Sequence, residues 1–398
     1  MRIVPSEEIA GRLVTFQAGL KKLEVQGAVI RQNTDLYYFT GTVQDGYLIV
    51  PAEGKPVFAV RRDVRRAEEQ SPLRPIVPLG NLKELPALVD EAVGAPAPRT
   101  LGLELDVLPA ATFFFFDEKL FPKDHLVDVG GLIRQVRMVK SAWELSMMRE
   151  AARISHAVAR AVPNLVREGM SEWDLMAELQ RVALLHGHLG FSRVRAFNLE
   201  IFFGHILSGP EAATPSYADS PTGGPGVSPA FGQGSGARAL KRGDLISVDT
   251  MMNRHGYLND QTRNFSLGEP HPQLRETYDL CRDLHQWLKE NAKPGAVTGE
   301  LYDAALELVK KAGRLENFMG PGGSGVSFLA HGLGLEVDEF PFIARGQKMV
   351  LQEGMTLAFE PKWAIPGVGI AGFENTYVVT PDGLESLNIT PEDLVVIS

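Results

Sequence analysis

The stretch Leu245–Gly268 constrains this chain more than any other. Its sequence, LISVDTMMNRHGYLNDQTRNFSLG, predicts two β-strands joined by the polar turn NRHG. If the turn is centred between Arg254 and His255, Asp249 and Asp260 face each other. Side chains directly opposite on antiparallel strands lie about 4.5–5.5 Å apart at Cβ. Two full charges about 5 Å apart repel by roughly 3 kcal/mol at an effective dielectric of 20, so this pair needs compensation.

Three arrangements would compensate the two aspartates: a shared proton, a basic partner or a bound cation. The alternative is an ordinary solvated hairpin in which a bulge separates the two carboxylates. The hairpin alone leaves all of these open.

Composition narrows the function classes. The chain has 398 residues, which suits two domains, and its 40 basic against 49 acidic residues leave a net charge of −9. This charge, without a long basic run, argues against a nucleic-acid partner. The single cysteine, Cys281, excludes an intrachain disulfide and a multi-cysteine zinc site and fits a reducing compartment. The N-terminus lacks the apolar segment of a secretory signal, and the run Phe113–Phe116 is too short to span a bilayer. We therefore expect a cytoplasmic protein without a membrane partner.

Residues 1–130 predict a small α/β domain with no cluster of metal-binding or nucleophilic side chains. The expected elements are a helix over 12–23, strands over 27–31 and 36–39, and a hairpin formed by 46–50 and 56–60. Such a domain would serve packing, dimerisation or the walling of a pocket.

Residues 131–398 predict an α+β domain with a curved, mostly antiparallel sheet. A capping box at Ser141 opens a helix over 142–162 that Pro163 ends, and Ser171 opens a second helix. Helices over 274–291 and, capped by Thr298, over 299–311 follow. The expected strands are 196–208, the hairpin, 356–360 and 373–379.

Three further residues in this half have metal-ligating side chains. His331 lies in AHGLG, where glycines permit close backbone approach, Glu360 closes the apolar strand MTLAFEP, and Glu374 lies in GFENTYVVT. A carboxylate inside an apolar strand is costly unless it is paired or binds metal. With the two aspartates they make four carboxylates and one imidazole. Two divalent ions, Mn²⁺, Co²⁺, Fe²⁺ or Zn²⁺, would suit that set.

Nearly the whole chain resembles the pita-bread metallopeptidases, which include aminopeptidase P, prolidase and methionine aminopeptidase, with creatinase as a fold relative. The resemblance rests on DTMMNRHGYLNDQTRNF, HGLGLEVDEFP, AFEP and GFENTYVVTPDG, and on the linker IRQVRMVKSAWELSMMREAA. It implies a creatinase-like N-terminal domain over 1–130 and a pita-bread catalytic domain over 131–398. It also implies a homodimer.

The resemblance further implies a ligand set and a mechanism. Asp260 and Glu374 would bridge two ions, with Mn²⁺ as the first expectation, Asp249 would bind one of them, and His331 with Glu360 the other. A metal-bridging hydroxide would attack the substrate, and Glu360 would act as the general base.

Two positions depart from the family pattern. Ser216 and Asp338 stand where the family has accessory histidines that donate hydrogen bonds to the substrate and to the developing oxyanion. A serine can donate without charge, whereas an ionised aspartate cannot donate and would repel an oxyanion. Losing one such donor typically costs about a hundredfold to a thousandfold in rate.

The segment 219–236, DSPTGGPGVSPAFGQGSG, also departs from the family by its glycine and proline content. It is either a lid over the site or a plain surface loop. His205 is a candidate to replace a missing imidazole; the alternative is an ordinary structural role. Tyr217 and Arg263 are candidates to line the pocket by position.

These observations lead to one prediction and two alternatives. We predict a dinuclear metal-dependent hydrolase of the aminopeptidase P or prolidase type, which removes an N-terminal residue from Xaa-Pro-like peptides. The first alternative, motivated by Ser216 and Asp338, is a non-peptidase metalloenzyme, a lyase or amidohydrolase acting on a small metabolite. The second is a catalytically silent peptide-binding module, which the complete ligand set disfavours.

Overall fold

The computed structural model describes residues 2–200 and 202–398, and the chain divides into two compact units between Arg137 and Met138. In the described part of the chain, the helices are too short or too polar to cross a membrane.

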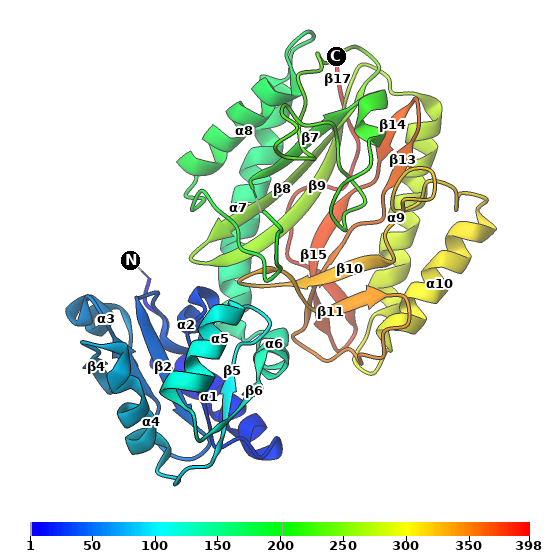
Figure 1. Cartoon of the computed structure of the whole chain (residues 1–398). Helices are drawn as coiled ribbons and strands as arrows, with labels where there is room; N and C mark the ends of the chain where they lie inside the picture. Colours follow the sequence, from blue (N-terminus) through cyan, green and yellow to red (C-terminus); the bar gives the residue numbers. More distant parts are fainter. Residues whose placement is uncertain (1, 201) are drawn as a thin grey trace. The chain divides into compact units, whose positions relative to one another are not determined.

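The first unit is a mixed sheet in the order β4-β3-β2-β1-β5-β6 (Figure 1). Its strands are β1 (Gly27–Ile30), β2 (Gly46–Pro51), β3 (Val57–Val60), β4 (Ile76–Pro78), β5 (Thr100–Leu103) and β6 (His125–Asp128). Its helices are α1 (Ser6–Lys22), α2 (Asn33–Thr40), α3 (Val64–Gln70), α4 (Leu85–Val93), α5 (Ala110–Phe115) and α6, which runs from Gly130 to Met138. The predicted hairpin is confirmed, because β2 and β3 pair antiparallel.

The strand predicted over 36–39 is wrong, since these residues belong to helix α2. The side chain of Gln32 caps its N-terminus by accepting a hydrogen bond from the Asp35 N–H. Gly41, with a φ of 79°, ends it in the left-handed conformation that favours glycine. Caps at both ends therefore outweigh the strand propensity of the intervening aromatic residues.

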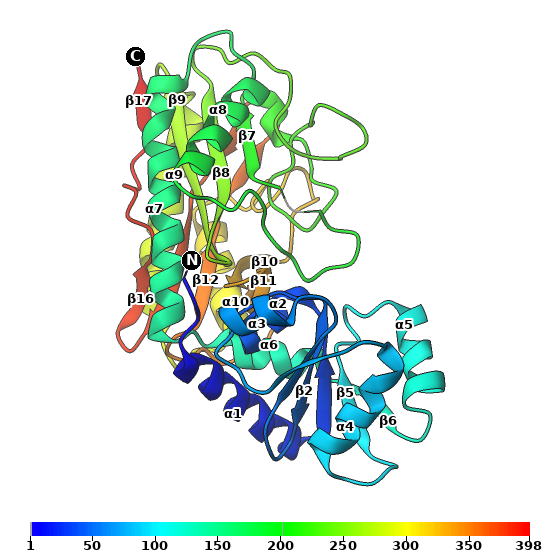
Figure 2. The ribbon, with the colours of Figure 1, turned by 90° about the vertical axis from the view of Figure 1, so that its left-hand side faces the viewer.

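The second unit is built on a strongly curved sheet in the order β11-β10-β12-β15-β9-β8-β7 (Figures 1 and 2). These strands are β7 (Gly204–Ser208), β8 (Leu245–Arg254), β9 (Tyr257–Leu267), β10 (Phe328–Leu333), β11 (Val337–Ala344), β12 (Thr356–Phe359) and β15 (Glu374–Thr380). The pairs along this order are antiparallel. The shorter strands are β13 (Trp363–Ile365), β14 (Gly369–Ala371), β16 (Gly383–Ser386) and β17 (Val395–Ile397).

The helices of this unit cover the sheet in two groups, each with its own core. Helices α7 (Ala142–Leu165) and α8 (Glu172–Leu185) pack with β7, β8 and β9. Helices α9 (Pro272–Asn291) and α10 (Thr298–Lys311) pack with β10, β12 and β15. The capping boxes predicted at Ser141 and Ser171 are both present.

Three predicted boundaries in this unit are corrected. Helix α7 continues two residues past Pro163, to Leu165. Thr298 is the first residue of α10 and provides no side-chain cap. The strand expected over 196–208 is confined to Gly204–Ser208, and Ile201 lies outside the described residues.

The central hairpin forms, but its register differs from the predicted one. Asp249 pairs with Thr262, two residues beyond Asp260. The turn residues are His255 and Gly256, with φ of 55° and 91°, and two-residue hairpin turns of this type require positive φ at both positions. The predicted turn was therefore centred one residue too early. Since side chains alternate with a period of two, both aspartates still point to the same face, as diagonal neighbours.

Candidate metal centre

A cavity of about 110 Å³ in the second unit is lined by all five predicted ligand side chains. Each comes from a different strand or strand end: Asp249 from β8, Asp260 from β9, His331 from β10, Glu374 from the start of β15, and Glu360 directly after β12. These strands are consecutive in the sheet order β10-β12-β15-β9-β8. The pairing of the sheet thus gathers residues that are more than a hundred positions apart in the chain.

Local contacts fix the two residues that the hairpin and β15 contribute. The hydroxyl of Thr262 donates a 2.9 Å hydrogen bond to Glu374 Oε2. The hydroxyl of Thr376 accepts from the Asp260 N–H at 3.0 Å and donates to the Asp260 carbonyl oxygen at 2.9 Å. These hydrogen bonds fix the carboxylate of Glu374 and the main chain of Asp260.

His331 is positioned by the close approach of the β10 and β11 backbones. A Cβ on Gly332 would collide with the Phe340 carbonyl, so glycine is required for β10 and β11 to lie this close. The His331 Nδ1 atom lies 3.1 Å from the Gly332 carbonyl oxygen. A proton on Nδ1 donated to that carbonyl leaves the lone pair of Nε2 directed toward the carboxylates, as in histidines that bind metals.

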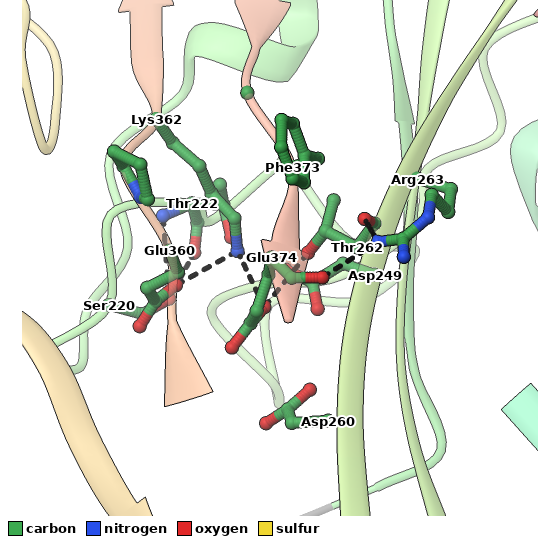
Figure 3. A network of polar contacts seen from close by, with 12 residues as sticks. Ser220, Thr222, Asp249, Asp260, Thr262, Arg263, Glu360, Lys362, Phe373 and Glu374 are labelled. Atoms are coloured by element: carbon green, nitrogen blue, oxygen red, sulfur yellow. Dashed lines mark hydrogen bonds and ion pairs between the residues drawn. The ribbon is translucent and has the colours of Figure 1, made fainter. Parts of the chain in front are cut away.

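The sequence reasoning missed Lys362, whose ammonium is buried among three of the predicted ligands (Figure 3). Its Nζ lies 2.7 Å from Asp249 Oδ2, 2.8 Å from Glu360 Oε2 and 3.2 Å from Glu374 Oε2. A basic partner was one of the three arrangements left open for the hairpin aspartates, and for Asp249 this is the one observed.

A signal for Lys362 was present in the sequence. It follows AFEP directly and is the only basic residue after Lys348. It also stands two positions after Glu360, where side chains of an extended segment point to the same side. An isolated lysine beside Trp363 in an apolar segment needs a buried anionic partner, because a lone buried ammonium is strongly disfavoured.

The charges of the cluster shift the pKa values of its members. Burial alone would lower the pKa of Lys362, but Asp249, Glu360 and Glu374 raise it well above its usual range. Burial would raise the pKa of Asp249, and Lys362 and His205 outweigh it and lower that pKa. Burial raises the pKa of Glu360 to about 7, an effect that Lys362 only partly offsets. Lys362 is therefore a permanent cation of the metal-free protein.

Asp260, His331 and Glu374 form a second group, which shares Glu374 with the first and fits a metal ion. One ligand atom from each lies within 4.8 Å of the others, and all three residues are buried. Asp260 Oδ1 and Glu374 Oε1 have no hydrogen-bond partner. Burial and the neighbouring Glu374 raise the pKa of Asp260 well above its usual range. Unpaired buried carboxylate oxygens beside an imidazole nitrogen are the donor set that a divalent cation stabilises.

A second divalent ion does not fit among Asp249, Glu360 and Glu374, because the ammonium of Lys362 lies there. The ammonium already donates hydrogen bonds to three carboxylate oxygens, and the Lys362 side chain is 1% exposed. A divalent ion about 4 Å from an ammonium is repelled by about 8 kcal/mol at an effective dielectric of 20. The donor set that fits a divalent ion is therefore that of Asp260, His331 and Glu374.

Two further candidates line the cavity. His205 on β7 pairs with Asp249 on β8, and its Nε2 lies 2.8 Å from the Thr222 hydroxyl and 3.5 Å from Asp249 Oδ2. Asp338 is the extra residue of a bulge in β11, with a φ of 63°, and its Oδ1 lies 3.7 Å from His331 Nδ1. Bulges commonly redirect a side chain beside a functional site.

The structure places Ser216, Tyr217 and Arg263 outside the lining of this cavity. Ser216 donates a hydrogen bond to the side chain of Gln233, which does line it. Tyr217 is half-exposed in the neighbouring surface groove. Arg263 is buried and donates to the main-chain carbonyls of Thr262 and Glu374, so it supports the site from outside the cavity.

The segment 219–236 is packed at the site rather than being a plain surface loop. Its residues Asp219, Ser220 and Gln233 line the cavity, and Thr222 contacts His205. The hydroxyl of Ser235 accepts a hydrogen bond from the Ile206 N–H of β7 at 2.7 Å. Both ends of the segment are thus anchored next to the cluster, while its middle, 227–230, is exposed.

Comparison with known proteins identifies the family. The model of metallopeptidase family M24 matches residues 146–381, which include the five predicted ligands and Lys362, and the creatinase/prolidase N-terminal domain matches residues 12–139. The chain belongs to metallopeptidase family M24. The prediction of an α+β pita-bread fold is confirmed by this match and by the likeness to solved prolidase structures.

Relatives of this M24 chain cover nearly its whole length. An Xaa-Pro dipeptidase of Pyrococcus furiosus is 27% identical over 386 residues, covering 96% of this chain and 98% of the relative. The probable dipeptidase PepE of Mycobacterium tuberculosis is 27% identical over 409 residues, covering 98% and 97%. These relatives support a hydrolase of the peptidase class.

Solved structures of the M24 fold superimpose over the whole chain. The prolidase from Pyrococcus horikoshii has a TM-score of 0.80 at 24% identity, covering 97% of this chain and 100% of that one. An Xaa-Pro dipeptidase from Bacillus anthracis has a TM-score of 0.83 at 23% identity, covering 98% and 99%. At these identities the likeness establishes the fold.

Proposed function

We propose that this chain is a metal-dependent hydrolase that cleaves the amide bond of a short Xaa-Pro-like substrate. The observation that carries the proposal is the position of the cluster of carboxylates and imidazole in the wall of a small cavity. The lining also has apolar side chains that suit a proline ring: Leu199, Phe202, Met251, Phe328 and Val337.

The cavity size favours a dipeptide over a longer peptide. Its volume of about 110 Å³ is below the roughly 300–1,000 Å³ of pockets that enclose drug-sized ligands. Asp219, Asp338 and Phe328 line both this cavity and a surface groove of about 660 Å³. We infer that the two aspartates lie at the entrance and attract the cationic end of a substrate, such as an N-terminal ammonium.

Each side chain then has a defined task. A divalent ion bound by Asp260, His331 and Glu374 would supply Lewis-acid chemistry at the cavity. Glu360, with Oε2 held by Lys362 and Oε1 3.8 Å from His331 Nε2, would accept the proton of the attacking water. His205, beside the Thr222 hydroxyl, would orient the substrate.

The test is a substrate panel on protein reconstituted with Mn²⁺, Zn²⁺, Co²⁺ or Fe²⁺. We expect hydrolysis of Xaa-Pro dipeptides, with tripeptides cleaved at least about tenfold more slowly because they exceed the cavity. An Asp260→Asn variant is the matched control and should be inactive. Intact dipeptides under all four metals would refute the proposal.

A second candidate is a non-peptidase hydrolase or lyase acting on a small metabolite on the same scaffold. It is favoured by Asp338, whose carboxylate lines the cavity and, when ionised, cannot donate a hydrogen bond to an oxyanion. If the chain is a peptidase with a weakened donor set, Asp338→His should raise kcat on Xaa-Pro dipeptides about tenfold or more. An unchanged or lower rate, together with activity on a non-peptide amide, would favour the second candidate.

A further inference from the structure

Lys362 satisfies its ammonium entirely with carboxylates that a metal ion would otherwise bind. An ammonium has three donors, and the structure supplies one carboxylate for each, from Asp249, Glu360 and Glu374. The side chain is 1% exposed, so water does not replace any of these contacts. Figure 3 shows dashed contacts from the ammonium to the carboxylates of Glu360 and Glu374.

The carboxylate oxygens that Lys362 leaves unused lie elsewhere. The two carboxylate oxygens of Glu374 differ. Oε2 accepts hydrogen bonds from Lys362 and Thr262, whereas Oε1 has no hydrogen-bond partner. Asp260 Oδ1 is likewise unpaired, and Asp260 is drawn apart from the ammonium in Figure 3. His331 completes this group, with Nε2 4.0 Å from Glu374 Oε1. The cluster therefore contains one position already filled by a cation and one that is prepared for a cation.

We propose that the ammonium of Lys362 permanently replaces one of the two metal ions of the family, so that this chain binds a single divalent ion through Asp260, His331 and Glu374. Lys362 is thus a positioning residue that holds Asp249 and Glu360 in the orientation a second ion would impose. The inference concerns the metal content of the site and does not depend on which bond the protein cleaves.

The charges of the cluster agree with one ion. The four carboxylates of the predicted ligand set carry four negative charges, and one ammonium with one divalent ion compensates three of them. A second divalent ion beside the ammonium would leave a buried excess of positive charge, which is strongly disfavoured. Two carboxylates and one imidazole form a mixed oxygen and nitrogen set that suits Mn²⁺, Fe²⁺, Co²⁺ or Zn²⁺.

The primary test is metal stoichiometry of the full-length protein. Purified protein is stripped with chelator, reloaded with Mn²⁺, desalted and analysed for manganese per chain, and titrated calorimetrically with Mn²⁺. We expect one ion per chain and the electron paramagnetic resonance spectrum of an isolated Mn²⁺. Two tightly bound ions per chain, or the spectrum of an exchange-coupled pair, would overturn the proposal, as would the absence of tight binding.

Two variants with the same substitution on the same hairpin sharpen the test. Asp249→Asn should leave the Mn²⁺ affinity within about threefold of the wild type, because Asp249 contacts Lys362 rather than the ion. Asp260→Asn should lower the affinity at least about a hundredfold, since it removes a ligand; outer-shell partners alone are typically worth 10–100-fold. Equal losses in both variants would refute the division of the cluster.

A third variant tests whether Lys362 itself excludes the second ion. Lys362→Met removes the charge at similar length and frees three carboxylates, so a second Mn²⁺ should bind. Lys310→Met, at an exposed position on α10, is the matched control and should bind one ion. A folded Lys362→Met protein that still binds one ion would contradict the replacement. If it does not fold, the wild-type stoichiometry and the two aspartate variants still decide the proposal. All readouts are metal content, so failure of the substrate panel would leave the inference standing.

Discussion

Replacement of Glu360 by Gln is expected to lower kcat by about 10²- to 10⁴-fold while the protein keeps one bound ion. This is the usual contribution of a positioned general base, and Gln preserves the shape of the side chain without accepting a proton. Steady-state kinetics on the best substrate of the panel and manganese analysis of the same sample measure both effects. Loss of the ion together with activity would instead make Glu360 an essential ligand.

The pH dependence of kcat/KM in the wild type tests the role of the same residue. Burial raises the pKa of Glu360 to about 7 in the metal-free protein, and a bound cation would lower it by favouring the ionised form. Only the ionised carboxylate accepts a proton, so kcat/KM should fall as the pH drops through a value at or below about 7. In the Glu360→Gln variant this limb should disappear. The same fall in the Glu360→Gln variant as in the wild type would contradict the assignment of Glu360 as the base.

Replacement of Arg137 by Met in the first unit is expected to lower the free energy of unfolding by about 3–5 kcal/mol. The guanidinium donates a 2.7 Å hydrogen bond to Asp35, and the two side chains are 2% and 0% exposed. The substitution removes the cation that is buried beside the Asp35 carboxylate, and the loss of one partner is the costly case for buried ion pairs.

The control for Arg137 is an exposed ion pair of similar geometry. Arg149 lies 2.8 Å from Glu385, but the two side chains are 43% and 56% exposed. Arg149→Met should therefore change the free energy of unfolding by less than about 1 kcal/mol. Urea unfolding of both variants at pH 7 measures the contrast, and similar values for the two would contradict the role assigned to burial.

Much of the second unit could be predicted because its signals are local. The capping boxes at Ser141 and Ser171 and the helices that they open depend on residues three positions apart. Helix α2 was missed for a related reason: its cap is the side chain of Gln32, which is not among the usual capping residues.

The candidate site was predicted in part. The five ligand types stand out because carboxylates inside apolar strands demand a partner, and the structure brings all five to one cavity. Ser216 was expected there on alignment alone, but its hydroxyl contacts Gln233 instead. The hairpin register was missed because the positive φ of His255 is not visible in its sequence.

The sequence by itself determined the family, the two helices that capping boxes open, and which acidic side chains require a counter-charge. Those properties follow from local patterns and from the cost of burying a charge. Only the tertiary structure decided which counter-charge each carboxylate receives. The order of strands β10-β12-β15-β9-β8 places Lys362 within 3.2 Å of Asp249, Glu360 and Glu374, and leaves Asp260 and His331 for an ion. A contact between residues 113 positions apart depends on strand pairing, which no local pattern encodes.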